Sequence, residues 1–220
     1  MTEKKKTIDR SRKRGNVSKK KQPLSDDGSL LQARNKQGGY ALNDDLVEQA
    51  LISGEYRDLL EIYFGEDLYD ELRGLTARAR TARTRGGPRV LVLPGIMGSK
   101  LGKQGVIFDD TIWLDPVDVI AGGIESLSLI NGDQGITALG VLLTVYLKIK
   151  LRLKLAGFDT DFHPFDWRQN IADEGARLAE RIRLETSSQH REVSLVAHSM
   201  GGLIARSAIK LLEGTGEDDK

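Results

Sequence analysis

The sequence of 220 residues contains no cysteine and lacks a long uncharged apolar run, and each absence excludes a class of protein. Without cysteine the chain has no disulfide framework, no thiolate metal site and no cysteine nucleophile. The longest uncharged stretch of its apolar middle, residues 134–147, has 14 residues, whereas a membrane-spanning helix needs roughly 18 to 20. No apolar run follows the basic start, so no secretory signal is predicted and the cytoplasm is the default location.

Charge is distributed unevenly along the chain. Residues 1–36 hold 12 basic and 4 acidic side chains, whereas the remainder holds 21 and 28. Residues 1–38 bury too little apolar surface to offset the entropy cost of ordering, so we expect a disordered basic arm. Its lysine runs lack interleaved aromatics, which argues against nucleic-acid binding by base stacking. A peripheral contact with an anionic membrane surface is the partner that its charge would suit.

Residues 39–85 carry apolar residues three or four positions apart, which is typical of amphipathic helices. Gly54 and Gly65 fall between the apolar groups and are expected to divide the stretch into separate helices. We therefore predict a small helical module over residues 39–85.

Beyond residue 85 short apolar strands alternate with helical segments. Strands are predicted at residues 90–93 and 192–197, both buried on two faces, and at 160–165; helices are predicted at about 140–155, 171–185 and 200–212. Residues 148–155 also alternate with period 2, as a strand would, but two adjoining apolar stripes at helical spacing favour the helix. This alternation predicts an α/β fold over residues 86–220, a parallel sheet with flanking helices.

The sharpest chemical signal is the hexapeptide AHSMGG at residues 197–202, where a predicted strand meets a predicted helix. A serine flanked two positions away on each side by small residues, here Ala197 and Gly201, is typical at such a turn of a nucleophile elbow, in which the backbone of the serine is strained. Ser199 is the candidate nucleophile, and the backbone N–H of Met200 is a candidate donor to an oxyanion. The alternative is that Ser199 is an ordinary N-cap of the last helix.

A second oxyanion donor is expected from the loop after an earlier strand. PGIMGS at residues 94–99 follows the first predicted strand, and the N–H of Ile96 is the candidate donor. A phosphate-binding loop is the alternative, but the glycines lack the spacing and the Gly-Lys-Ser/Thr ending of such loops. The pattern calls for no cofactor and no metal ion.

The motifs VLVLPGIMGSKL, IWLD, HPFDWR and VSLVAHSMGGLIAR, in this order, resemble the lecithin:cholesterol acyltransferase family of the α/β-hydrolase superfamily over about residues 89–212. The resemblance implies an α/β-hydrolase sheet and an acyl-enzyme on Ser199, formed from lipid-like or other acyl esters by an esterase, a lipase or an O-acyltransferase. It implies an oxyanion hole of the Ile96 and Met200 amides. It also implies that residues 102–136, with Phe108, Trp113 and Leu114, lie near a substrate mouth or lid. For Trp113 and Trp167 a structural role with a paired indole N–H stays open.

The pattern breaks at the catalytic base. In this fold an acid and then a histidine follow the nucleophile, yet the 21 residues after Ser199 contain no histidine. His190 precedes the nucleophile strand at the wrong end of the sheet, and His198 is expected to line the site or to pack under it. In the strand order that the resemblance implies, His163 ends a strand two positions from the nucleophile strand, roughly 10 Å away. We therefore expect a domain truncated after the elbow helix, completed by a further segment or a second chain. The alternative is an inactive remnant that serves as an interaction module.

Overall fold

A computed structural model describes residues 44–82, 87–103, 110–113, 127–129, 135–189 and 192–214. The predicted basic arm, Phe108, Leu114 and His190 lie outside the described residues. The elements follow one another as α1 (Asp44–Ser53), α2 (Arg57–Phe64), α3 (Glu66–Thr81), β1 (Arg89–Leu93), β2 (Ser99–Lys103), β3 (Asp110–Trp113), β4 (Ile136–Val141), α5 (Leu143–Leu155), β5 (Asp159–Phe162), α6 (Ile171–Gln189), β6 (Val193–Ala197) and α7 (Met200–Gly214).

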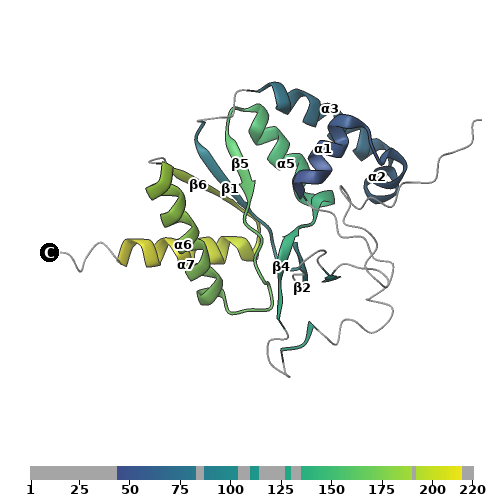
Figure 1. Cartoon of the computed structure of the whole chain (residues 1–220). Coiled ribbons are helices and arrows are strands. Elements are labelled where there is room, and N and C mark those ends of the chain that lie inside the picture. The colour runs from purple at the N-terminus through teal and green to yellow at the C-terminus, as the bar shows by residue number, and fades with distance from the viewer. Residues whose placement is uncertain are drawn as a thin grey trace, which may run out of the picture.

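The three predicted strands form one parallel sheet with the order β5-β1-β6, in which Arg89 of β1 lies opposite Asp159 of β5 and Val193 of β6. Helices cover both of its faces, with α6 and α7 on one side and α5, α1 and α3 on the other (Figure 1). Alternate side chains of β1 enter the two layers, because successive residues of a strand point to opposite faces. The α/β architecture predicted from the alternation of strands and helices is confirmed.

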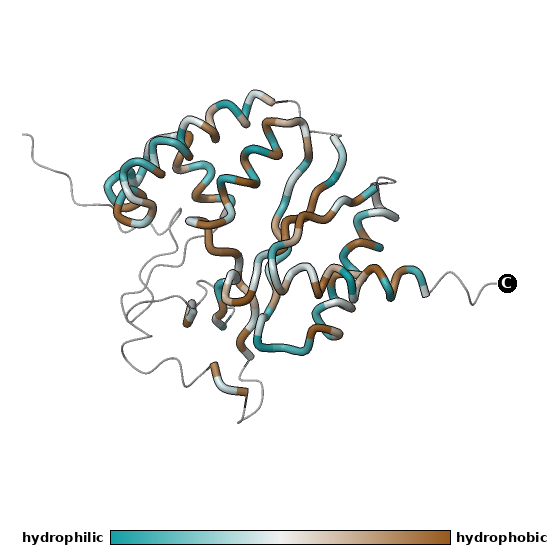
Figure 2. The backbone as a smooth tube through the Cα atoms, turned by 180° about the vertical axis from the view of Figure 1, so that it is seen from behind, coloured by the Kyte–Doolittle hydropathy of each residue, from teal (hydrophilic) through white to brown (hydrophobic). Residues whose placement is uncertain are grey.

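The central strand β1 is the apolar middle of the molecule. Val90 and Val92 pack towards α5 and the N-terminal helices, and Leu91 and Leu93 pack towards α6 and α7; all four are at most 2% exposed. In Figure 2 hydrophobic residues gather where this sheet passes between the helical layers, and hydrophilic residues are frequent along the helices around it. A strand buried on both faces was expected here, and β1 has that character.

The edge strand β6 differs from the prediction of a strand buried on both faces. Its five residues are half-buried or exposed. In the described sheet β6 pairs with β1 on one side only, and an edge strand leaves one row of its backbone groups without a neighbouring strand. The strand predicted at residues 160–165 also ends earlier, at Phe162, and Pro164 beyond it has no N–H to donate to a ladder.

A second sheet was not predicted. It is antiparallel, with the order β3-β2-β4, and the pairing shifts register next to Leu101 against both neighbours. The sheet follows directly on the loop after β1, and it places β2 beside the segment after β5, where the N–H of Phe165 donates to Ser99 Oγ at 3.1 Å. This sheet therefore supports one side of the loop that contains Ile96.

The helical module is present as α1, α2 and α3, divided at Gly54 and Gly65, whose φ angles of 78° and 80° are those that glycine adopts most readily. These helices pack on α5, and Lys154 Nζ lies 2.6 Å from Glu48 Oε2 across the contact. Residues 148–155 lie within α5, so the helical interpretation of that stretch is correct. The division into separate domains at residue 85 stays a prediction, and the module shares one hydrophobic core with the sheet.

Within the described residues, no helix is both long and apolar enough to cross a lipid bilayer.

Candidate functional site

The turn between β6 and α7 holds Ser199 in a left-handed backbone conformation with φ of 52°. Three non-glycine residues of the described chain have a positive φ, and two of them, Met97 and Ser199, lie in neighbouring turns. Such a conformation is costly for a side chain with a Cβ and persists only where the surroundings impose it. An ordinary N-cap has extended backbone angles instead. The geometry at Ser199 is therefore that of a strained strand-to-helix turn and differs from a plain N-cap.

Backbone hydrogen bonds impose this turn. The N–H of His198 donates to the carbonyl of Leu93 in β1 at 3.1 Å, and the N–H groups of Gly201 and Gly202 donate to the carbonyls of His198 and Ser199 at 2.9 Å. The Met200 N–H begins the helix, so no carbonyl lies one turn earlier within α7 to accept its hydrogen. The positive end of the helix dipole adds to this donor, and α7 has no acidic residue in its first turn.

Close packing against β1 explains the glycine that follows the serine turn. A Cβ at residue 201 would lie 2.4 Å from the Pro94 carbonyl oxygen and 2.9 Å from Leu93 Cβ. The same atom at Gly202 would meet nothing within 4 Å. Only the first of the two glycines is therefore required by space, as the sequence pattern predicted for residue 201.

The loop after β1 forms a second tight turn beside Ser199. The N–H of Gly98 donates to the carbonyl of Gly95 at 3.0 Å, and Met97 between them has φ of 59°. A Cβ at Gly95 would lie 3.2 Å from Ser199 Cβ and 2.9 Å from His198 Nδ1. The structure thus brings the loop of Ile96 against the turn of Ser199 and Met200. Two apolar residues of this loop, Ile96 and Met97, are 59% and 47% exposed.

Tyr146 of α5 connects the two turns, a role that its place in the sequence does not indicate. Its hydroxyl accepts a hydrogen bond from the Gly95 N–H at 2.9 Å and lies 2.9 Å from His198 Nδ1. In the sequence Tyr146 is one member of an apolar helical stripe, and that pattern carries no sign of a polar contact with residues about 50 positions away.

The two tryptophans of the motifs IWLD and HPFDWR donate hydrogen bonds to the backbone of the loop after β1 and of the first residue of β2. Trp113 Nε1 donates to the carbonyl of Met97 at 3.1 Å, and Trp167 Nε1 donates to the carbonyl of Ser99 at 3.3 Å. Their rings meet edge to face, with centroids 5.5 Å apart. The structural role with a paired indole N–H, which the sequence left open, accounts for both residues.

His163 is placed away from Ser199. It follows β5, which β1 separates from β6, and its ring is 8% exposed. Burial, reinforced by the positive charge of Arg181, lowers the pKa of His163 to about 4. Its Nδ1 lies 3.5 Å from Arg181 Nη1. The ring is therefore neutral at physiological pH and two strands from the serine.

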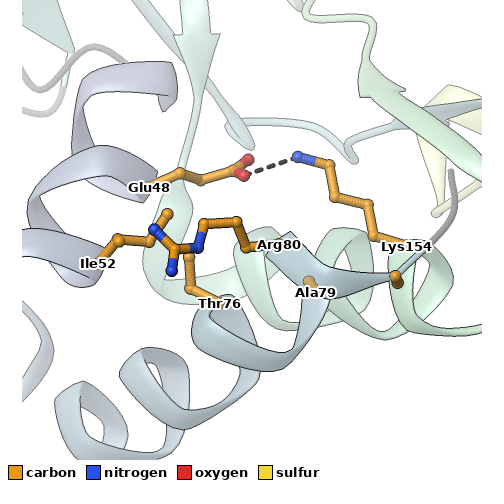
Figure 3. Close-up of a pocket in the computed structure, with 7 residues that line it drawn as sticks. Glu48, Ile52, Thr76, Ala79, Arg80 and Lys154 are labelled. Atoms are coloured by element: carbon orange, nitrogen blue, oxygen red, sulfur yellow. Dashed lines mark hydrogen bonds and ion pairs between the residues drawn. The ribbon is translucent and has the colours of Figure 1, made fainter. Parts of the chain in front are cut away.

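A cavity of about 220 Å³ lies elsewhere, between α1, α3 and α5 (Figure 3). It is lined by Glu48, Ile52, Thr76, Ala79, Arg80, Ala82 and Lys154. Lys154 lies eight residues after Tyr146 on α5, about 12 Å along the helix axis, so this cavity is separate from the serine turn. In the part of the chain that the structure describes, no cluster of histidine and acidic side chains could hold a metal ion.

One family model matches the chain, that of the family described as "Putative serine esterase (DUF676)", over residues 166–218. That segment is similar to a serine esterase family. It contains β6, the Ser199 turn and α7, and it leaves out the loop of Ile96. No curated protein and no solved structure matches the chain. The similarity supports an esterase-like α/β-hydrolase, a broader class than the lecithin:cholesterol acyltransferase resemblance.

Proposed function

We propose that this protein is a serine-dependent hydrolase of acyl esters and that Ser199 is its nucleophile. The observation that carries the proposal is the left-handed backbone of Ser199, with φ of 52°, at a strand-to-helix turn. This geometry supports a nucleophile elbow, a turn that exposes the serine hydroxyl above the sheet. The similarity of residues 166–218 to a serine esterase family supports the same assignment.

The proposed reaction begins when Ser199 Oγ attacks the carbonyl carbon of the ester. The carbonyl oxygen becomes an oxyanion, to which the N–H groups of Ile96 and Met200 would donate. The serine proton passes through a base to the departing alcohol, which leaves the acyl group on Ser199. Water then attacks the acyl-enzyme, releases the carboxylic acid and restores the serine.

The base for this reaction is proposed to come from outside the described residues, from a further segment or a second chain. His163 is buried and two strands away. His198 precedes the serine, and its Nδ1 is already in contact with the Tyr146 hydroxyl at 2.9 Å.

The exposed apolar residues Ile96 and Met97 would suit the acyl chain of a lipid-like ester. Both belong to the loop whose Gly95 lies against Ser199, and burying such surface against an acyl chain is favourable at about 25 cal/mol per Å². Transfer of the acyl group to an alcohol, as the acyltransferase resemblance implies, would need an acceptor to replace water in the second step. The proposal therefore specifies the acyl-enzyme and takes water as the acceptor.

Labelling with a fluorophosphonate tests the proposal, because this probe forms a stable adduct with an activated serine. Wild type, Ser199→Ala and Ser194→Ala are labelled in parallel and read by intact mass. Ser194 is an exposed serine of β6, five residues before the turn, and serves as the matched control. We expect one adduct on wild type and on Ser194→Ala and none on Ser199→Ala. Folded wild-type protein that forms no adduct, either alone or together with the further segment or second chain that supplies the base, would contradict the proposal and favour the inactive interaction module.

A further inference from the structure

The hydroxyl of Tyr146 is in contact with both turns of the candidate site at once. Tyr146 lies in the first turns of α5 and is 7% exposed. The Gly95 N–H donates to its oxygen at 2.9 Å, and His198 Nδ1 lies 2.9 Å from the same oxygen. Gly95 belongs to the loop of Ile96, and His198 directly precedes Ser199. The two segments that carry the nucleophile and both oxyanion donors are therefore joined through one phenol oxygen.

We propose that Tyr146 is a positioning residue, whose hydroxyl sets the loop of Ile96 at a fixed distance from the turn of Ser199 and Met200. The inference rests on the proposed function, because it assigns the two backbone donors to one oxyanion. Donors to an oxyanion act only when they are held in place before the reaction, and a displacement of about 1 Å can cost a hundredfold in rate. The Tyr146 hydroxyl is hydrogen-bonded to Gly95 and His198, so its effect on the serine passes through the two turns.

The protons of this bridge follow from the donor inventory. A phenol oxygen has one hydrogen to donate, and here it already accepts the Gly95 N–H. Towards His198 Nδ1 the phenol is the donor when the imidazole carries its hydrogen on Nε2, and its oxygen is again the acceptor when the hydrogen is on Nδ1. In either arrangement the phenol oxygen joins the two turns.

The glycines of the loop leave the space that this bridge occupies. A Cβ at Gly98 would lie 2.9 Å from the Tyr146 hydroxyl and 2.8 Å from Pro94 Cβ, and a Cβ at Gly95 would lie 2.9 Å from His198 Nδ1. Both glycines of the motif thus lie against the bridge. Their place in the sequence is explained by the bridge as well as by the turn itself.

The helix that carries Tyr146 is anchored independently of the loop. Lys148 Nζ of α5 lies 2.7 Å from Glu71 Oε2 of α3, and Leu147 and Leu151 of α5 are fully buried in the shared core. A positioning residue is effective when its own place is set by packing elsewhere. Tyr146 meets this condition because α5 is packed between the sheet and the N-terminal helices.

The test compares Tyr146→Phe with Tyr69→Phe in the full chain. Tyr69 lies in α3, is 0% exposed and belongs to the same core, and its hydroxyl has no hydrogen-bond partner within the described residues. Both variants remove one buried hydroxyl and keep the ring, so they differ in the bridge alone. We expect Tyr146→Phe to slow fluorophosphonate labelling of Ser199 about tenfold and Tyr69→Phe to leave the rate unchanged.

Two measurements detect the hydrogen bonds of the Tyr146 hydroxyl independently of any reaction at Ser199. In Tyr146→Phe, hydrogen exchange of the Gly95 amide should accelerate, and the ¹⁵N signal of His198 Nδ1 should move away from the position of a hydrogen-bonded nitrogen. Tyr69→Phe should change neither signal. Thermal unfolding of each variant verifies that it is folded.

The outcomes separate the bridge from the chemistry. Equal labelling rates in folded Tyr146→Phe and wild type would overturn the positioning role, and so would unchanged Gly95 and His198 signals. If wild type is not labelled, alone or with the segment or chain that supplies the base, although both signals respond to Tyr146→Phe, the bridge exists but the proposed function fails, and the positioning role fails with it. A slower reaction together with both spectral changes supports the proposal.

Discussion

The contact of Gly201 with β1 gives a quantitative prediction, because its neighbour Gly202 is a control in the same helical turn. The perturbation is Gly201→Ala. The new Cβ would lie 2.4 Å from the Pro94 carbonyl oxygen, about 1 Å inside ordinary van der Waals separation. The obstructing atom belongs to the backbone and cannot rotate away, so either β1 or the start of α7 must move.

The magnitude follows from the cost of overpacking. Extra methyl groups in a packed core typically cost about 1 to 3 kcal/mol, and a backbone obstacle places Gly201→Ala at about 3 kcal/mol of destabilisation. At Gly202 a Cβ meets nothing within 4 Å, so alanine there gains up to about 1 kcal/mol from its better helix propensity. The two variants should therefore differ by about 4 kcal/mol in the free energy of unfolding.

Urea unfolding followed by circular dichroism measures this difference. With a urea dependence of about 2 to 3 kcal/mol per molar, Gly201→Ala should lower the unfolding midpoint by roughly 1 to 1.5 M, and Gly202→Ala should leave it unchanged or raise it. Fluorophosphonate labelling of Ser199 should also slow in Gly201→Ala, since the turn that holds the serine is displaced. Equal midpoints for the two variants would refute the close contact between the turn and β1.

Three further predictions concern the buried polar groups around the sheet. Arg168→Met should destabilise the protein by about 3 kcal/mol or more, because it leaves the carboxylate of Asp166, 3% exposed, without its partner at 2.5 Å. Arg57→Met, at an ion pair with Glu61 that is open to solvent, should lower the urea midpoint much less than Arg168→Met does. Thr160→Val should preserve or slightly raise the unfolding midpoint, because the buried Thr160 hydroxyl has no hydrogen-bond partner in the described chain and its removal relieves a desolvation cost; a large loss would show that the hydroxyl is bonded. Burial lowers the pKa of His163 from 6.5 to about 4, so below pH 6.5 the unfolded chain binds a proton that the folded chain does not. Stability from this group is therefore complete above pH 6.5 and falls by on the order of 3 kcal/mol towards pH 4; His163→Phe should flatten this part of the pH profile of unfolding, and an unchanged slope would contradict the assignment.

The second sheet shows why part of the fold was not predictable from the sequence. Residues 99–103 and 136–141 pair in antiparallel register although more than 30 residues separate them, and the register shifts within β2. Neither segment has the clean alternation or the short hairpin turn that marks a strand pair locally. Their pairing depends on the path of the chain between them, which no local pattern specifies.

The candidate site also has a part that the sequence predicts and a part that it does not. The strand-to-helix turn at Ser199 and the small residue at 201 could be predicted, because strand, turn and helix are consecutive in the chain. The role of Tyr146 could not, because its partners Gly95 and His198 lie 51 and 52 residues away. The tryptophan partners were hidden for the same reason, with Trp167 bonded to a carbonyl 68 residues before it.

The sequence by itself determined the parallel strands, the helices between them and the serine turn. Apolar periodicity and small residues act over a few neighbouring positions, so their effect can be predicted from a short stretch of sequence. Only the tertiary structure decided that β6 is half-exposed, that the loop of Ile96 lies against Ser199, and that His163 is held neutral behind β1. Each of these depends on which distant segments exclude water from a group or supply its hydrogen-bond partner, and that is set when the layers pack together.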